Sequence, residues 1–534
     1  MKSIKLAVLI AGAAGLLTGC AWIQEPQPGK QQVKDFFISP SACEMNVNAD
    51  YAPLQWELDE TYFSEWFIGD ICSDDAVKGG QGISDMAMAY DLENFRGNAD
   101  NTILLSYYRA NLLGIARCNS SLEWLSDMEF PDDSTWTDAY KNRLLGEVYF
   151  LRAYYMFRLL RVFGAFPMST EPIKETTKWR MARTDVPTIY AQIESDLLQA
   201  NSKLMLKSQM APADAGRATK GAAQAMLLKT FLYRGEYAQA KAWGDSVISS
   251  GEYDLVADYA VNFKLEGENN IESVFEIQYV NEDASDYGGR GGTRGTFTTI
   301  LTRARAQIGG EEGWGFNKPS QSLYDEFEDG DARRDATILL PPSQWQKDDD
   351  NYLGNHYLNR KTGLYNEAGD GSAYHLAHHT RGDLNNKQIR YADVLLMYAE
   401  ACAESGDATT AATYLNMVRA RARDFAISKG ADPSVLPDYP GYTYKENGFG
   451  TAAAPANIMA AIRHERRVEL GMEAHRWFDL VRWGIADQVM NNYRANEKEE
   501  ITEHMYPFVK GVHELFPLPT KEIELNPMEQ NPGY

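Results

Sequence analysis

The chain of 534 residues is too long for one small core and long enough for one large or two medium-sized domains. Its hydrophobic content of 44% and charged content of 24% are ordinary for a soluble globular protein. A formal net charge of −23 argues against a nucleic-acid partner, because phosphates would be repelled, and it leaves neutral ligands such as sugars open.

Residues 1–19 predict a signal peptide. Two lysines precede an apolar run over residues 6–17, which is too short to span a bilayer comfortably. The sequence L-T-G-C at 17–20 resembles the bacterial lipobox, in which cleavage leaves the cysteine at the new N-terminus carrying lipid. The alternative is a plain secretory signal with a cysteine there by chance. We expect lipidation at Cys20, so that the protein is bound to a membrane through this anchor.

Residues 20–48 are expected to form the lipidated N-terminus and a tether, since their first part is polar and carries two prolines. Helical periodicity follows. Apolar residues recur at helical spacing over 107–125 and, more strongly, over 142–164. The second helix should end at Gly164, just before Pro167.

Two stretches, residues 223–243 and 395–415, share one pattern: a helix, a glycine, an acidic residue and an alanine five positions after the glycine. The matching pairs are Gly235 with Ala240 and Gly406 with Ala411. This is the pattern of tetratricopeptide repeats, in which a tight turn is followed by a small residue where paired helices approach closely. It favours a mainly α scaffold of stacked helical hairpins over a doubly wound sheet.

Strands are scarce. Residues 273–280 alternate enough to predict one, and a glycine-rich loop follows it. Long irregular stretches are expected at 311–322, 341–385 and 430–455. Insertions of that size on a rigid scaffold usually carry function.

The segment HERRVELGMEAHRWFDLVRWG, residues 464–484, mixes arginines and carboxylates with large apolar side chains. On a helical wheel its apolar residues form one stripe, and its charges lie on the neighbouring face with opposite charges three positions apart. Catalytic carboxylates need unequal environments, whereas here every acid has an arginine nearby that would keep it ionised. We therefore predict structural ion pairing within one helix, and not acid–base catalysis.

This segment resembles the C-terminal motif of the RagB/SusD-like family of nutrient-uptake lipoproteins. Three other stretches resemble further motifs of that family in the same order: LRAYYMFRLLRVFGAFP at 151–167, IRYADVLLMYAEA at 389–401 and the proline-rich tail LFPLPTKEIELNPMEQNPGY at 515–534. Together with the lipobox, the resemblance runs from Cys20 to Tyr534.

The resemblance implies a SusD-like fold, with tetratricopeptide-like hairpins and long loops, divided into an N-terminal half at 49–230 and a C-terminal half at 231–534. It implies an outer-membrane protein, facing the cell surface, that captures an oligosaccharide, or in some members a peptide, and passes it to a SusC-like TonB-dependent transporter without catalysis. One departure is that few acidic residues follow Cys20, where surface-exported lipoproteins often carry several.

Sugar recognition uses aromatic rings against pyranose faces, with carboxylates, amides and arginines bonding the hydroxyls. The family often carries a Trp eleven residues before the Asn of its second helix, here Asn119, which points to Tyr108, with Asn111 one turn later. A core position for Tyr108 is at least as probable on its pattern. Asp74 and Asp75 resemble paired aspartates of a family loop, or they cap a helix.

Further ligand contacts are expected in the irregular region after the strand. We put Trp314 first, since its flanking glycines should leave it exposed, although loop tryptophans also fill gaps in a scaffold. The other candidates there are Tyr279, Tyr287, Arg290 and Phe316.

No cofactor and no metal site is predicted. His375, His378 and His379 lack a carboxylate or cysteine to complete a zinc site, and the aspartates at 348–350 lack the rest of a calcium loop. Cys43, Cys72, Cys118 and Cys402 are widely spaced and suggest no disulfide framework. The alternatives to glycan binding are peptide binding within the same family and a helical glycan-degrading enzyme.

Overall fold

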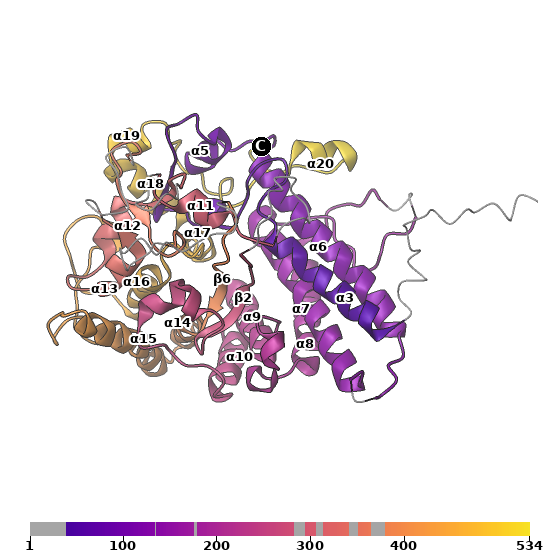
Figure 1. Ribbon diagram of the computed structural model, residues 1–534. Helices are drawn as coiled ribbons and strands as arrows, with labels where there is room; N and C mark the ends of the chain where they lie inside the picture. The colour runs from indigo at the N-terminus through magenta and orange to yellow at the C-terminus, as the bar shows by residue number, and fades with distance from the viewer. Residues whose placement is uncertain are drawn as a thin grey trace, which may run out of the picture.

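The computed structural model describes residues 39–133, 135–175, 179–281, 294–305, 313–340, 351–364 and 380–534 (Figure 1). Within them the chain is mainly helical with short strands, as predicted. Cys20, the histidines at 375–379 and the aspartates at 348–350 lie outside the described residues. No helix among the described residues has the length and apolar character needed to cross a membrane.

Helix α3 (Pro40–Tyr51) begins inside the segment that was expected to be tether. Its start is locally determined, because the side chain of Ser39 accepts a hydrogen bond from the amide of Ala42 and Pro40 occupies the first helical position, where no amide hydrogen is needed. The helix packs on α6 (Thr102–Asp127) and α7 (Asp138–Phe163), so the residues from 40 to 48 belong to the folded body.

Helices α6, α7 and α8 (Val186–Lys203) pack in sequence order, and Figure 1 shows them as the long purple helices on one side of the molecule. The predicted helices at 107–125 and 142–164 are confirmed as parts of α6 and α7. α7 ends at Gly164, whose φ of +69° suits a residue without a side chain. α6 and α7 approach closely at Gly114, where an added Cβ would lie 2.6 Å from the ring of Tyr155.

Both predicted hairpins are confirmed: α9 (Lys220–Tyr233) with α10 (Tyr237–Ser249), and α14 (Tyr391–Glu404) with α15 (Ala408–Ser428). Gly235 and Gly406 form the turns with φ of +71° and +84°. Ala240 and Ala411 are buried. The two hairpins also stack on each other through α10 and α14, although about 150 residues separate them in the chain.

The part of the chain that the structure describes contains three two-stranded antiparallel sheets. The predicted strand at 273–280 is confirmed as β2 (Ser273–Ile277), and it pairs with β6 (Asn386–Arg390), directly before α14. The other sheets pair β1 (Ala76–Gly79) with β3 (Phe316–Pro319), and β4 (Ile338–Leu339) with β5 (Leu358–Asn359).

The remaining helices are short and belong mainly to the C-terminal part of the chain. They are α4 (Trp66–Gly69), α5 (Ala87–Glu93), α11 (Thr298–Thr302), α12 (Gln321–Glu326), α13 (Ala332–Thr337), α16 (Ile458–Leu470), α17 (Arg476–Arg482), α18 (Ala486–Asn496), α19 (Glu499–Thr502) and α20 (Thr520–Leu525). Single 3-10 turns lie at η2 (Ala52–Gln55), η4 (Lys207–Gln209), η5 (Pro212–Asp214), η6 (Tyr259–Phe263), η7 (Leu265–Gly267) and η8 (Glu446–Gly448).

The single helix predicted over 464–484 is wrong, because the segment forms α16 and α17 with a break between them. Met472 and Ala474 adopt left-handed φ values of +66° and +63° in that break. The turn is fixed from outside the segment: Oδ1 of Asp70 accepts the amide of Ala474 at 2.8 Å, and Gly69 packs against the Ala474 backbone. Tertiary contacts therefore override the local helical pattern.

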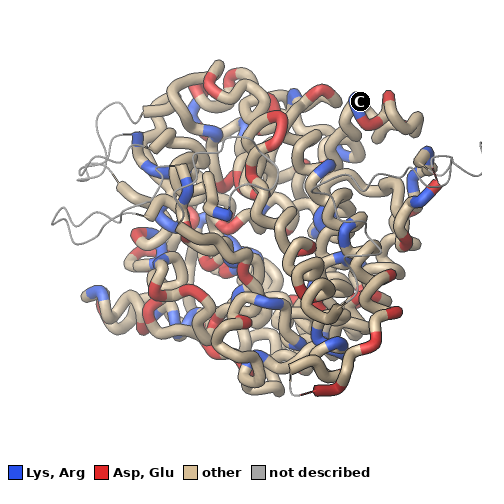
Figure 2. Tube along the Cα trace, turned by 45° about the vertical axis from the view of Figure 1, so that its right-hand side comes forward, with Lys and Arg blue, Asp and Glu red and all other residues tan. Residues whose placement is uncertain are grey.

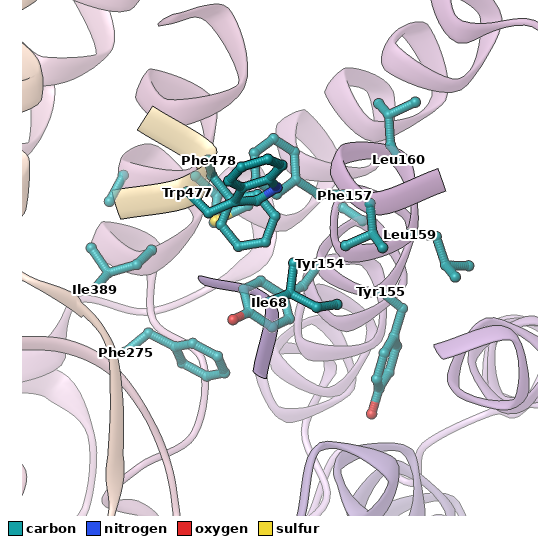
Figure 3. Close-up of a cluster of buried hydrophobic side chains, with 14 of the residues drawn as sticks. Ile68, Tyr154, Tyr155, Phe157, Leu159, Leu160, Phe275, Ile389, Trp477 and Phe478 are labelled. Carbon is teal, nitrogen blue, oxygen red and sulfur yellow. The ribbon is translucent and has the colours of Figure 1, made fainter. Parts of the chain in front are cut away.

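The core joins the helical hairpins to the C-terminal part. Figure 3 shows Trp477 and Phe478 of α17 in one cluster of buried side chains with Tyr154 and Phe157 of α7 and Phe275 of β2. All five side chains are buried. The large apolar residues of the charged segment therefore fasten the two parts of the chain together.

The predicted ion pairing of this segment is confirmed, but most of its partners are distant in sequence, and within the segment Asp479 pairs with Arg466 and Arg482. Glu469 accepts from Arg333, Arg390 and Arg421, which lie on α13, at the end of β6 and on α15. The ion pairs expected at a spacing of three within one helix do not form; they are Arg466 with Glu469, Glu473 with Arg476, and Arg476 with Asp479. Arg476 instead binds Asp74. Figure 2 shows acidic and basic residues intermingled along the described chain, and four of the cysteines, at 43, 72, 118 and 402, are free and buried.

Candidate functional site

Trp314 is held by the end of a helix. The amides of residues 313–315 donate to the carbonyls of Ala304, Ile300 and Arg303 at 2.8, 2.8 and 3.0 Å, at the C-terminal end of α11. Ile300 belongs to the last turn of α11, whose carbonyls have no partner within the helix, and Arg303 and Ala304 directly follow the helix. The three bonds therefore fix the backbone that carries the indole ring. The ring is positioned before any ligand arrives.

The glycines beside Trp314 serve close backbone approach. A Cβ on Gly313 would lie 2.3 Å from the carbonyl oxygen of Arg303, and Gly315 has φ of +68°. A Cβ on Gly79 of β1 would lie 2.2 Å from the carbonyl oxygen of Gly315. The ring itself is half-buried, so it is less open than its flanking glycines suggested.

Trp314 and Tyr62 form an aromatic platform. Their ring centroids lie 5.4 Å apart at an interplanar angle of 70°, and Tyr62 meets Phe297 edge-on at 5.1 Å. Tyr62 closes a short turn through its bridge to Leu58 and is half-buried, like Trp314. Edge-to-face contacts of this kind hold each ring in place.

A polar cluster lies on the same turn, two residues before Tyr62. Glu60 accepts from Arg109 of α6 at 3.2 Å and from Lys521 at 3.0 Å, and Arg109 donates to Glu522 of α20 at 2.6 Å. All four side chains are partly exposed. We call Glu60, Arg109, Lys521 and Glu522 the Glu60 cluster.

Glu60 stays ionised near neutral pH. A hydrogen bond from Lys521 and the positive charge of that lysine hold the pKa of Glu60 below its ordinary value. Next to Trp314, Arg305 donates to the carbonyl of Trp314 at 2.9 Å and lies 4.0 Å from Asp85. The platform is therefore bordered by ionised groups that can donate and accept hydrogen bonds at sugar hydroxyls.

Tyr108 and Asn111 lie in the core of the structure. The ring of Tyr108 meets Phe163 of α7 edge-on at 5.1 Å, and Asn111 donates to the carbonyl of Tyr107 at 2.7 Å. Neither side chain presents a face to solvent. Of the two residues between them, Arg109 does reach the surface, because it lies about 100° further around the helix than Tyr108.

Asp74 and Asp75 are fully buried and bind arginines. Arg476 donates to Asp74 at 2.8 Å, and Arg467 reaches Asp75 at 2.8 Å and Asp74 at 2.9 Å. Burial alone would raise the pKa of Asp74, but the charges of Arg467 and Arg476 outweigh it and lower the pKa. These bonds fasten the segment before β1 to α16 and α17.

The remaining expected contacts are also away from the surface or undescribed. Tyr279 and Phe316 are buried, the first donating its amide to Asn385 at 2.8 Å and the second lying in β3. Tyr287 and Arg290 lie outside the described residues. Among the predicted contacts that the structure describes, Trp314 alone is not buried.

Sequence reasoning missed Tyr62, Glu60, Arg109 and Arg305. Arg109 could have been found from the helical pattern of α6, because a charged residue next in sequence to a residue of the buried face points away from the core. Nothing in the sequence relates the turn at 58–62 to Trp314, because their contact depends on how α6, α11 and the turn pack together.

Comparisons with known proteins agree with this architecture. The model of the SusD family matches residues 271–534, and a model described as starch-binding associating with outer membrane matches residues 59–232. The SusD-like protein P2 of Formosa agariphila is 23% identical over 560 residues, with 100% of both chains covered.

Solved structures share the fold. A laminarin-binding SusD-like protein is 28% identical with a TM-score of 0.73, covering 93% of this chain and 100% of its own. The surface glycan-binding protein A from Bacteroides thetaiotaomicron, in complex with laminarihexaose, is 21% identical with a TM-score of 0.72, covering 92% and 99%. With family models matching both parts of the chain and the helical hairpins in place, this protein belongs to the SusD/RagB family.

Proposed function

We propose that this protein captures a neutral glycan at the outer membrane and delivers it to a SusC-like TonB-dependent transporter. The observation that carries the proposal is the platform of Trp314 and Tyr62, fixed by the end of α11 and bordered by the Glu60 cluster. The laminarin-binding relative supports it, since that protein is the more similar in sequence of the two solved structures.

The chemistry of the platform suits sugar binding. One face of a pyranose ring is apolar and packs on an indole or phenol ring, while its equatorial hydroxyls need donors and acceptors around the edge. Arg109 and Lys521 provide donors, and Glu60 and Glu522 provide acceptors. No bond needs to be made or broken, so the role we propose is binding and release without catalysis.

The charge of the chain favours a neutral glycan. The net charge is −23, and the Glu60 cluster contains as many carboxylates as cations. A uronate or sulfated glycan would therefore meet a repulsive field without a surplus of cations to bind it. Among neutral glycans, laminarin is the first to test, because the relatives above bind laminarin or laminarihexaose.

The route to the membrane is part of the proposal. Lipidation of Cys20 would anchor the chain, and the residues between Cys20 and α3 would form the link to the folded body. We place the folded body on the outer face of the outer membrane, where a glycan is met and a transporter can be reached. Replacing Cys20 with alanine should release the protein from the membrane fraction.

The test combines binding with product analysis. The protein from residue 21 onwards, incubated with laminarin, should bind it and leave the chain length of the glycan unchanged. Release of reducing ends that grows with time would instead identify a glycan-degrading enzyme. Absence of binding to laminarin and to a panel of other neutral glycans, together with binding to peptides, would favour the peptide-binding alternative. Co-purification of a TonB-dependent barrel with the lipidated protein tests the delivery step.

A further inference from the structure

A wide groove of about 1240 Å³ lies at the C-terminal part of α6. The Glu60 cluster beside the platform meets α6 nearer its N-terminal end, at Arg109. Its walls are the C-terminal part of α6, the middle of α7 and α8, and a crossing segment described at residues 169–175 and 179–181, of which Trp179 itself is not part of the lining. The volume exceeds that of sites for drug-sized ligands, and the lining is mostly polar. The lining includes Asn119, Glu123, Arg152, Ser195, Asp196 and Met181.

Buried hydrogen bonds fix the shape of the groove. Arg152 binds Asp196 through two bonds of 2.7 Å and donates to Asn119 at 2.9 Å, and all three side chains are buried. Arg152 also donates to the carbonyl of Thr170 at 2.9 Å, and Asn119 to that of Ser169 at 2.9 Å. The floor therefore holds the crossing segment in place, so the groove is built into the fold.

An exposed tryptophan lies on the crossing segment. Trp179 is 64% exposed, more than any other large apolar side chain among the described residues except Leu525 at 66%. Trp179 and Leu525 are close in sequence to Met181 and Asn526, which are joined by two hydrogen bonds. The backbone amide of Met181 donates to Oδ1 of Asn526 at 3.1 Å, and Nδ2 of Asn526 donates to the carbonyl of Met181 at 2.7 Å. An aromatic side chain left in water beside a polar groove marks an interaction surface.

A chain of contacts connects this surface to the platform. From Asn526, α20 leads to Glu522, which binds Arg109, and Arg109 binds Glu60 on the turn that carries Tyr62. Along α6, Arg109 and Glu123 of the groove wall lie 14 residues apart on nearly the same side, a distance of about 20 Å at 1.5 Å per residue. The groove and the platform are two parts of one surface.

We infer that the groove with Trp179 is a second contact surface for a long neutral glycan. The inference rests on the proposed function and extends it, because a chain held on Trp314 would need many sugar units to reach Trp179. Five acidic side chains, including Glu123 and Asp196, line the groove against three basic ones, including Arg152, which disfavours an anionic chain. Its occupant is therefore a polymer, and short oligosaccharides engage the platform alone.

Two-point attachment makes a clear thermodynamic difference. Once a polymer is held at one point, its second contact forms at a high effective concentration, so the affinity for the polymer exceeds that for a short piece. Loss of the groove should therefore weaken binding of the polymer and leave binding of a trisaccharide unchanged. Loss of the platform should weaken both.

The experiment compares laminarin with laminaritriose in four variants. Trp179→Ala removes the exposed ring, and Ser195→Trp fills the groove from an exposed position on α8. Trp314→Ala tests the platform, and Tyr506→Ala removes another exposed aromatic ring that lies elsewhere, 5.7 Å from Arg96. We expect both groove variants to lose about tenfold or more in affinity for laminarin and to keep their affinity for laminaritriose.

Other outcomes overturn the inference in distinguishable ways. If the unchanged protein binds neither glycan, the proposed function fails together with the inference. If Trp314→Ala weakens both glycans while Trp179→Ala and Ser195→Trp bind laminarin normally, only the second surface is refuted. If those two variants instead lose a co-purified transporter with laminarin affinity intact, the groove is a protein contact and the glycan inference is overturned.

Discussion

Arg390 and Glu469 form a buried ion pair of 3.0 Å, although 79 positions separate them in the chain. Arg390 belongs to the stretch at 389–401 and Glu469 to the stretch at 464–484, two of the stretches by which the family resemblance was recognised. Arg466 and Asp393, from the same two stretches, form a second pair at 2.8 Å. The residues that identify the family therefore build its frame, while the ligand platform comes from turns and loops.

Glu469→Gln should destabilise the protein severely. The carboxylate accepts from Arg333, Arg390 and Arg421, and none of the four side chains is more than slightly exposed. Each of these arginines keeps another carboxylate partner, but the amide would leave the buried network with one positive charge in excess, at a cost of about 3–5 kcal/mol. Urea denaturation of both proteins, which gives their free energies of unfolding, measures this loss of stability.

Asp438→Asn is the matched control for that variant. Asp438 pairs with Arg423 at 2.9 Å, but both side chains reach solvent, so the change should cost less than about 1 kcal/mol. Equal losses for Glu469→Gln and Asp438→Asn would show that the buried network adds no stability beyond an ordinary surface pair.

Stability should fall as pH rises through 9 because of His464. Burial alone would lower the pKa of His464, but hydrogen bonds of 3.0 and 3.1 Å to Glu326 and Glu328 and their charges outweigh it and raise the pKa to about 9. The charged ring thus stabilises the folded state fully below the unfolded pKa of 6.5. That stabilisation is lost between pH 6.5 and 9, and it is on the order of 3 kcal/mol.

A comparison with His464→Gln isolates this effect from other titrations. The unfolding midpoint of the unchanged protein should drop more steeply between pH 6.5 and 9.5 than that of the variant. Glu328 does not interfere, because His464 and Arg419 lower its pKa to about 2 against the effect of burial, so it stays ionised throughout. Parallel curves for the two proteins would show that His464 is not charged in the folded state.

Much of the scaffold could be predicted because its signals are local. A glycine at positive φ followed by a small buried residue fits within one hairpin, so Gly235 and Gly406 could be recognised from the sequence alone. The break between α16 and α17 could not, since Ala474 takes its left-handed conformation from Asp70, about 400 positions earlier. Contacts between residues distant in sequence therefore determine the backbone conformation at this break, which the local pattern does not indicate.

The candidate site was less predictable than the frame. In the sequence, a buried aromatic or acidic residue looks the same as one that contacts a ligand. Only the packing shows that Tyr108 faces Phe163 and that Asp74 binds Arg476. Trp314 could be chosen because it lies in an irregular stretch. Its neighbour Tyr62, about 250 positions earlier, carried no motif at all.

Gly244→Ala tests the stacking of the two hairpins. A Cβ at Gly244 of α10 would lie 2.4 Å from Cδ2 of Tyr398 on α14, near the stem of the ring, where the side chain cannot easily give way. Alanine would gain about 1 kcal/mol in helix propensity, but overpacking should cost more, for a net loss of about 1–2 kcal/mol. Gly82→Ala, which meets nothing within 4 Å, should be neutral, and a stabilised Gly244→Ala protein would contradict this packing.

Trp314→Ala should weaken binding of laminarin by about 1–3 kcal/mol, as loss of a stacking ring does, and leave the thermal midpoint nearly unchanged. The backbone at this position is held by carbonyls of α11, so it should survive loss of the ring. Trp136→Ala is the control: this tryptophan is also half-buried and makes edge contacts with Phe130 and Tyr140 at 6.2 and 5.2 Å, away from the platform. Titration calorimetry that gives all three proteins the same affinity would remove Trp314 from the binding site.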